Sequence, residues 1–102
     1  MKKLLCSVAC AFLFTSPAWA VIDANRTISR VGVQNTNSTA YVQFTVAPSG
    51  GCNYDILYVS LTTDAGRANY ALLLTAQANR STIKRVDYSV SSGTCTINLI
   101  EI

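Results

Sequence analysis

The chain has 102 residues, in which eight lysines and arginines stand against five aspartates and glutamates, and it contains no histidine. A chain of this length is too short to build two hydrophobic cores. The lack of histidine excludes hydrolases that rely on a Ser–His or Cys–His pair.

Residues 1–20 have the pattern of a secretory signal. Lys2 and Lys3 form a cationic start, an apolar run follows at 4–14, and the Ala-Trp-Ala sequence at 18–20 is a small-x-small cleavage site. The apolar run is much shorter than the ~20 residues of a membrane-spanning helix, so we expect no retained membrane span. Cleavage leaves a single secreted or periplasmic domain, residues 21–102, with six basic side chains against five acidic ones.

Two cysteines, Cys52 and Cys95, remain in this domain. In an oxidising compartment, an even pair of cysteines in a small domain predicts a disulfide. Two thiols without a histidine cannot supply the four nitrogen or sulfur ligands that structural zinc requires. We therefore expect a disulfide and neither a metal nor a cofactor.

Three extended segments come first in the domain. The first, 26–34, is rich in β-branched residues but alternates poorly. The second, 40–46, alternates apolar and polar residues, which is typical of a sheet with one buried face. The third, 53–61, shows little alternation and predicts a strand that is covered on both faces.

The periodicity then changes to that of a helix. We predict a helix over 65–79, with Thr63 or Asp64 as the N-cap, because alanines and leucines fill a broad apolar arc at 100° per residue. Tyr70 and Leu73 lie beside the polar side of this arc. Either they contact a partner or a second copy of the chain, or a second layer of the same chain packs on them.

A fourth strand is predicted over 82–90 and a fifth over 94–102. Each places apolar side chains on one face: Val86, Tyr88 and Val90 in the fourth, and Cys95, Ile97 and Leu99 in the fifth, with Ile100 and Ile102 opposite. The order of three strands, a helix and two strands predicts a mainly β, α+β fold, an OB-like five-stranded partly open barrel. An open α+β sheet is the main alternative.

The charged residues do not form a recognisable catalytic pattern. The carboxylates are scattered along the chain, and a Ser-x-x-Lys sequence at 81–84 lacks the motifs that accompany it in penicillin-recognising enzymes. Arg80, Lys84 and Arg85 form a small basic group near Tyr88, too small a charge for phosphate-driven binding. We interpret these as solvated strand-end charges and expect neither an enzyme nor a nucleic-acid-binding protein.

The second half of the domain carries a family resemblance. An Ala/Leu helix segment at 70–76 leads into Arg80–Lys84, the basic-Val-Asp-Tyr run at 85–88 and the late cysteine segment at 93–95. These features resemble a group of small exported bacterial proteins of unknown function and, more remotely, the B subunits of AB5 toxins of the subtilase cytotoxin type. The toxin resemblance implies an OB-fold, a ring of five subunits and recognition of cell-surface sugars, without transferring any glycan-contact residue.

Our leading hypothesis is a secreted, non-enzymatic binding module for carbohydrate. In OB-folds, ligands bind on the face of strands two and three and on the first-to-second and fourth-to-fifth loops. The side chains expected there are polar or aromatic: Asn35, Asn37, Ser38, Tyr41, Gln43, Ser91 and Ser92. The alternative is a structural or protein-interaction subunit of an exported complex, with Tyr70 and Leu73 on its contact surface.

Overall fold

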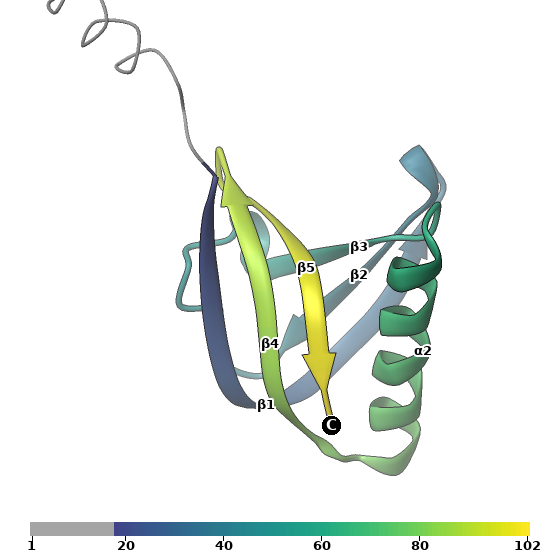
Figure 1. Cartoon of the computed structure of the whole chain (residues 1–102). Coiled ribbons are helices and arrows are strands. Elements are labelled where there is room, and N and C mark those ends of the chain that lie inside the picture. The colour runs from purple at the N-terminus through teal and green to yellow at the C-terminus, as the bar shows by residue number, and fades with distance from the viewer. Residues whose placement is uncertain (1–17) are drawn as a thin grey trace, which may run out of the picture.

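The computed structural model describes residues 18–102, which are mainly β with one α-helix (Figure 1). The strands are β1 (Trp19–Gln34), β2 (Thr39–Phe44), β3 (Ile56–Ser60), β4 (Thr82–Ser91) and β5 (Thr94–Glu101). The helix α2 (Asp64–Asn79) lies between β3 and β4, and short 3₁₀ turns, η1 (Thr36–Ser38) and η2 (Asn53–Asp55), precede β2 and β3. The predicted element order is therefore confirmed. Most of the predicted secretory segment, 1–17, lies outside the described residues.

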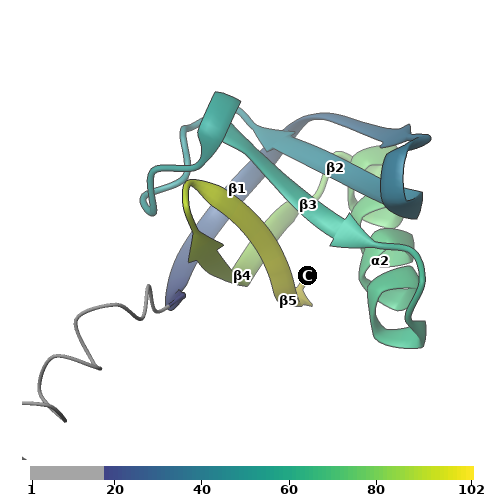
Figure 2. The same ribbon diagram turned by 90° about the horizontal axis from the view of Figure 1, so that it is seen from above.

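The strands close into a ring in the order β1-β2-β3-β5-β4, the OB-like barrel that the element order predicted (Figures 1 and 2). All joins are antiparallel except that between β3 and β5, which is parallel. This parallel join has the fewest paired residues: Leu57 pairs with Cys95, and Tyr58 pairs with Thr96. Because β1 pairs with both β2 and β4, the alternative of an open sheet is wrong.

The strand β1 is longer than predicted, because it begins at Trp19 rather than Arg26. Its first half pairs with β4 and its second half with β2, so one bent strand serves two neighbours. The left-handed backbone of Asn25 (φ 55°) and a β-bulge at Ser29 lie within it. Such irregularities bend a strand and increase its twist, which closes the ring.

Inward-facing side chains of β2, β3, β4 and β5 form the core, together with Cys52 and two residues of α2, and partly buried side chains of β1 pack against it. The fully buried members are Ala40, Val42, Leu57, Val59, Leu73, Ile83, Val86, Tyr88 and Cys95. The expectation that the third strand is covered on both faces is wrong. In β3, Leu57 and Val59 are buried, whereas the alternating residues are only half-buried.

The strand β5 also departs from its predicted pattern. The register shifts between Asp87 and Tyr88 of β4, whose partners are Leu99 and Ile97, so Asn98 is an extra residue in β5. This bulge reverses the alternation, turning Leu99 outward at 39% exposure and Ile100 into the core.

The helix α2 packs against the barrel with a face different from the one predicted. Leu73 is fully buried, and Tyr70 packs partly buried against the core, whereas Leu74 is 43% exposed. The expectation that Leu73 lies on a partner surface is therefore wrong. The helix carries alanines on most of its sides, so its hydrophobic periodicity does not distinguish one face from another.

The first turn of α2 fixes the helix against the end of β3. The Thr63 hydroxyl accepts a hydrogen bond from the Gly66 amide at 3.0 Å, which confirms Thr63 as the N-cap. A Cβ atom at Gly66 would collide with the backbone carbonyl oxygen of Ser60. Glycine is therefore required here by the close approach of two backbones.

Whether alanine at position 66 stabilises or destabilises the protein tests this close approach of the two backbones. At an ordinary helical position, glycine to alanine stabilises a helix by about 1 kcal/mol. We expect Gly66→Ala instead to lower the free energy of unfolding by about 1–3 kcal/mol, because the collision is with backbone rather than a flexible side chain. Urea unfolding of both proteins measures the change, and a more stable variant would contradict the packing described.

Candidate functional site

A groove of about 470 Å³ lies on the outer surface of the barrel. Its lining comes from the end of β1, the η1 connection, β2, β3 and β5: Gln34, Asn37, Thr39, Tyr58, Ser60, Thr94 and Thr96. The η1 connection and the β4–β5 hairpin stand at the upper side of the barrel in Figure 1, with β2 and β3 running between them. This is the surface on which OB-folds bind their ligands.

Cross-strand pairing explains how the groove residues come together. Tyr58 on β3 lies opposite Tyr41 on β2, and its other neighbour is Thr96 on β5. Tyr41 in turn lies opposite Gly32, where an added Cβ would come within 2.5 Å of the tyrosine ring. The ring of Tyr41 therefore covers the glycine on the β1 side, and Tyr58 is the cross-strand neighbour of Tyr41 on the β3 side. We call these two neighbouring positions the Tyr41–Tyr58 strip.

The groove is polar but carries no charge among its lining side chains. Apart from Tyr58, these side chains are amides and hydroxyls, which can both donate and accept hydrogen bonds. Charged ligand groups would find no ion-pair partner among them. The arrangement suits a neutral ligand that combines many hydroxyl groups with a flat apolar face for the tyrosine.

The residues of the β1–β2 connection that the sequence singled out occupy different places. Asn37 lines the groove, with a left-handed backbone (φ 59°), and its carbonyl accepts a hydrogen bond from the Thr39 hydroxyl at 3.1 Å. Asn35 and Ser38 are exposed in the same connection but do not line the groove. The carbonyl of Ser38 accepts from the Leu61 amide at 2.9 Å, which ties the connection to the end of β3.

The other residues that the sequence predicted for this surface do not line the groove. Tyr41 and Gln43 are half-buried on the outer face of β2. Ser91 and Ser92 are exposed at the tip of the β4–β5 hairpin, just before the groove residue Thr94.

Sequence reasoning missed most of the groove lining, notably Tyr58, Thr94 and Thr96. Tyr58 went unrecognised because the third strand was expected to be buried on both faces. The alternating hydroxyl residues Thr94 and Thr96 were a usable signal, since positions two apart in a strand share a face.

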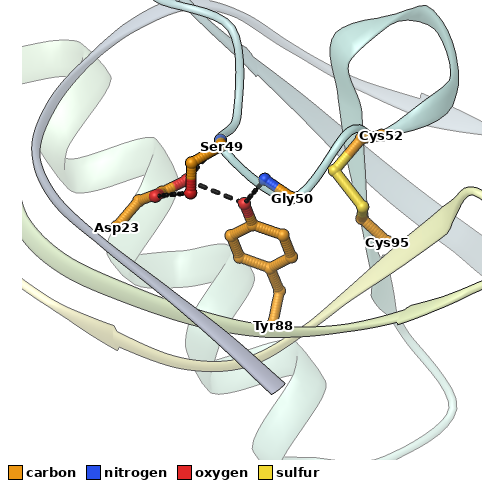
Figure 3. Close-up of a disulfide and its surroundings, with 6 residues drawn as sticks. All are labelled: Asp23, Ser49, Gly50, Cys52, Tyr88 and Cys95. Atoms are coloured by element: carbon orange, nitrogen blue, oxygen red, sulfur yellow. Dashed lines mark hydrogen bonds between the residues drawn. A yellow bond between two sulfur atoms is a disulfide. The ribbon is translucent and has the colours of Figure 1, made fainter. Parts of the chain in front are cut away.

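A second polar cluster is built around buried Asp23 and shares no residue with the groove lining (Figure 3). The hydroxyl of Tyr88 donates to Asp23 Oδ2 at 2.8 Å, and the amide of Ser49 donates to the same oxygen at 3.1 Å. The Ser49 hydroxyl also donates to Asp23 Oδ1, and Arg26 Nη2 lies 3.5 Å from that oxygen. The amide of Gly50 donates to the Tyr88 hydroxyl at 2.9 Å.

These hydrogen bonds set the ionisation of the cluster. Burial raises the pKa of the Asp23 carboxyl, but the hydrogen bonds from Ser49 and Tyr88, aided by the positive charge of Arg26, outweigh it and leave that pKa below its ordinary value. Burial and the hydrogen bond to Asp23 raise the pKa of the Tyr88 phenol. The cluster therefore holds a neutral phenol against an ionised carboxylate.

The cluster and the disulfide together fasten the loop between β2 and β3. The predicted bond between Cys52 and Cys95 is present, with a Cα–Cα distance of 5.5 Å. Figure 3 shows the loop running from Ser49 and Gly50, above the Tyr88 ring, to the disulfide. We therefore assign the Asp23 cluster a structural role, joining β1, β4 and this loop.

The predicted basic group does not share a surface with Tyr88. The Tyr88 side chain is fully buried, and Arg80 is the left-handed C-cap residue of α2. The guanidinium of Arg85 makes two hydrogen bonds to the carboxylate of Asp87, at 2.7 and 2.8 Å. An aromatic and basic platform of the kind that single-stranded nucleic acids use is therefore not formed by these residues.

Residues 18–102 offer no cluster of three or more histidine, cysteine, aspartate or glutamate side chains suited to hold a metal ion. Within the same residues, no helix combines the length and the apolar character that crossing a membrane requires. Comparison of the chain with protein-family models, curated proteins and solved structures finds no match. The groove and its chemistry are therefore the basis for a functional proposal.

Proposed function

We propose that the chain is an exported, non-enzymatic binding module that holds a neutral carbohydrate in the groove between the η1 connection and the β4–β5 hairpin. The observation that carries this proposal is the pairing of Tyr58 with Tyr41 beside a lining of amides and hydroxyls. A sugar ring has an apolar C–H face that packs on an aromatic ring, and hydroxyls that satisfy amide and hydroxyl partners.

The charge distribution supports binding rather than turnover. The carboxylate of Asp23 accepts hydrogen bonds from Tyr88 and from Ser49 of the loop. Those of Asp64 and Asp87 pair with arginines. Paired carboxylates across a scissile bond, which most glycosidases need, are absent from the groove lining. The disulfide supports export, because such bonds persist in oxidising compartments.

A panel of neutral saccharides tests the proposal. It consists of glucose, galactose, mannose and N-acetylglucosamine, each as oligomers of one to four units. We expect at least one of them to bind, and Tyr58→Ala and Tyr41→Ala to weaken binding about threefold to tenfold through loss of the aromatic contact. Leu74→Ala, an exposed helix residue outside the groove, is the matched control.

Two outcomes count against the proposal. One is that no saccharide of the panel binds above background. The other is that Tyr58→Ala and Leu74→Ala bind the same saccharide with equal affinity, which would place the ligand elsewhere.

A protein-interaction role in an exported complex is the second candidate. Its supporting observation is a cross-strand row on the outer face of β1, β4 and β5, in which Ile22 (59% exposed) and Leu99 (39% exposed) flank Asp87. The toxin resemblance adds the expectation of a five-subunit ring. Light scattering distinguishes the two roles: a protein that binds no sugar but forms a defined oligomer favours the second.

A further inference from the structure

Tyr54, in the η2 turn before β3, is an exposed aromatic residue in an unfavourable backbone conformation. The residue is 83% exposed, and its φ and ψ are 59° and 16°. The next residue, Asp55, is also left-handed (φ 57°). A bulky residue is strained in this region, and glycine or asparagine would largely avoid that strain.

The backbone around Tyr54 is held in place from several directions. The amide of Asn53 donates to the Gly93 carbonyl at 2.7 Å, and the amide of Asp55 donates to the Cys52 carbonyl at 3.1 Å. The Gln43 side-chain amide donates to the carbonyl of Tyr54 itself at 3.4 Å. The turn therefore presents an exposed ring on a constrained backbone, with little conformational entropy left to lose on binding.

These contacts also place Tyr54 at the hairpin end of the groove. Its neighbour Asn53 packs its side chain against Gly93, which directly precedes the groove residue Thr94. Gln43 shares the outer face of β2 with Tyr41, two residues away. The Tyr54 backbone thus lies beyond the Tyr41–Tyr58 strip, on the side of Gln43 and the β4–β5 hairpin, and it carries an exposed aromatic side chain.

We propose that Tyr54 forms a second aromatic subsite at this end, so that the preferred ligand is a saccharide chain of several units rather than a single sugar. This inference rests on the proposed function. One unit packs on the Tyr41–Tyr58 strip and a later unit of the same chain packs on Tyr54. Affinity then rises with chain length, because the second contact is made without a second loss of translational freedom.

The subsite is tested by measuring how the native protein and two variants bind saccharide oligomers of one to four units. The variants are Tyr54→Phe, which keeps the ring, and Tyr54→Asn, which removes the ring but suits a left-handed backbone. We expect the longest oligomer to bind Tyr54→Asn about threefold to tenfold more weakly than the native protein, the loss of one aromatic contact. We expect Tyr54→Phe to bind the longest oligomer with the native affinity. We expect single sugars to bind all three proteins equally.

The failure of this inference is distinguishable from that of the proposed function. If affinity rises with chain length equally in the native protein and in Tyr54→Asn, or does not rise at all, the Tyr54 subsite is wrong while the groove stands. If saccharides of every length fail to bind, both are overturned. Melting temperatures of the two variants at or above the native value show that a loss of binding is not a loss of folding.

Discussion

Reduction of the Cys52–Cys95 disulfide is expected to lower the free energy of unfolding by about 4 kcal/mol. The bond closes a loop of 43 residues, and the entropy that such a cross-link removes from the unfolded chain has about this size. A domain this small has a total stability of only about 5 kcal/mol or somewhat more. The reduced protein should therefore be marginally stable or unfolded at body temperature.

Thermal unfolding with and without reductant measures this effect. The double variant Cys52→Ala/Cys95→Ala is the control, because it should melt at the temperature of the reduced protein and be insensitive to reductant. Reduction should also abolish ligand binding, since Cys95 lies between the groove residues Thr94 and Thr96. A melting temperature that does not change on reduction would contradict the stabilising role of the bond.

Replacement of Asp23 by asparagine is expected to lower the free energy of unfolding by about 2–4 kcal/mol at neutral pH. The carboxylate accepts hydrogen bonds from Ser49 and Tyr88 and faces Arg26, whereas the amide accepts fewer hydrogen bonds and carries no charge. Hydrogen bonds to a charged group contribute about 1.5–3 kcal/mol, and a half-buried arginine would lose its partner.

The pH dependence of stability follows from the lowered pKa of Asp23. Because this pKa is lower in the folded protein than in the unfolded chain, the unfolded chain takes up the proton first as the pH falls. The contribution of Asp23 is therefore complete above about pH 4 and is lost below it. Urea unfolding at pH 7 and at pH 3 should show a smaller acid loss for Asp23→Asn than for the native protein.

Tyr88→Phe provides a second variant for this cluster, because it keeps the buried ring and removes the hydroxyl that Asp23 and Gly50 share. It should destabilise the protein less than Asp23→Asn and reduce part of the acid sensitivity. Equal acid sensitivity in the native protein and in Asp23→Asn would show that this carboxylate does not govern acid unfolding.

The sequence predicted the features that depend on local pattern or on counting. The alternation of 40–46 correctly predicted the buried face of β2, although the strand ends at Phe44 and leaves Val46 exposed. The surviving cysteine pair correctly predicted the disulfide. The change of period after Thr63 correctly placed the helix within one residue at its start.

The features that failed depend on pairing between distant segments. The first half of β1 contains Asp23 and Asn25, which are unfavourable in strands, and it is extended because β4 pairs with it. Leu73 is buried because the barrel, rather than the helix's own periodicity, decides which face is covered.

The groove lies on the face that the element order predicted for a ligand, but its lining was predicted only in part. The OB-like order predicted a ligand surface on the β2–β3 face and the two flanking connections, and of the predicted residues Asn37 lines the groove. Tyr58 and the β5 threonines were missed, because the parallel pairing of β3 with β5 brings together residues that are far apart in the chain.

Amide chemical-shift mapping of the isotopically labelled protein, titrated with the saccharide panel, tests the central claim most directly. If the groove binds a neutral carbohydrate, the shifts should concentrate on Asn37, Tyr58, Thr94 and Thr96 and saturate with added ligand. The amide chemical shifts of Ser49 and Gly50, in the Asp23 cluster, should not change. Shifts centred on that cluster or on the helix, or no saturable shift with any member of the panel, would contradict the account.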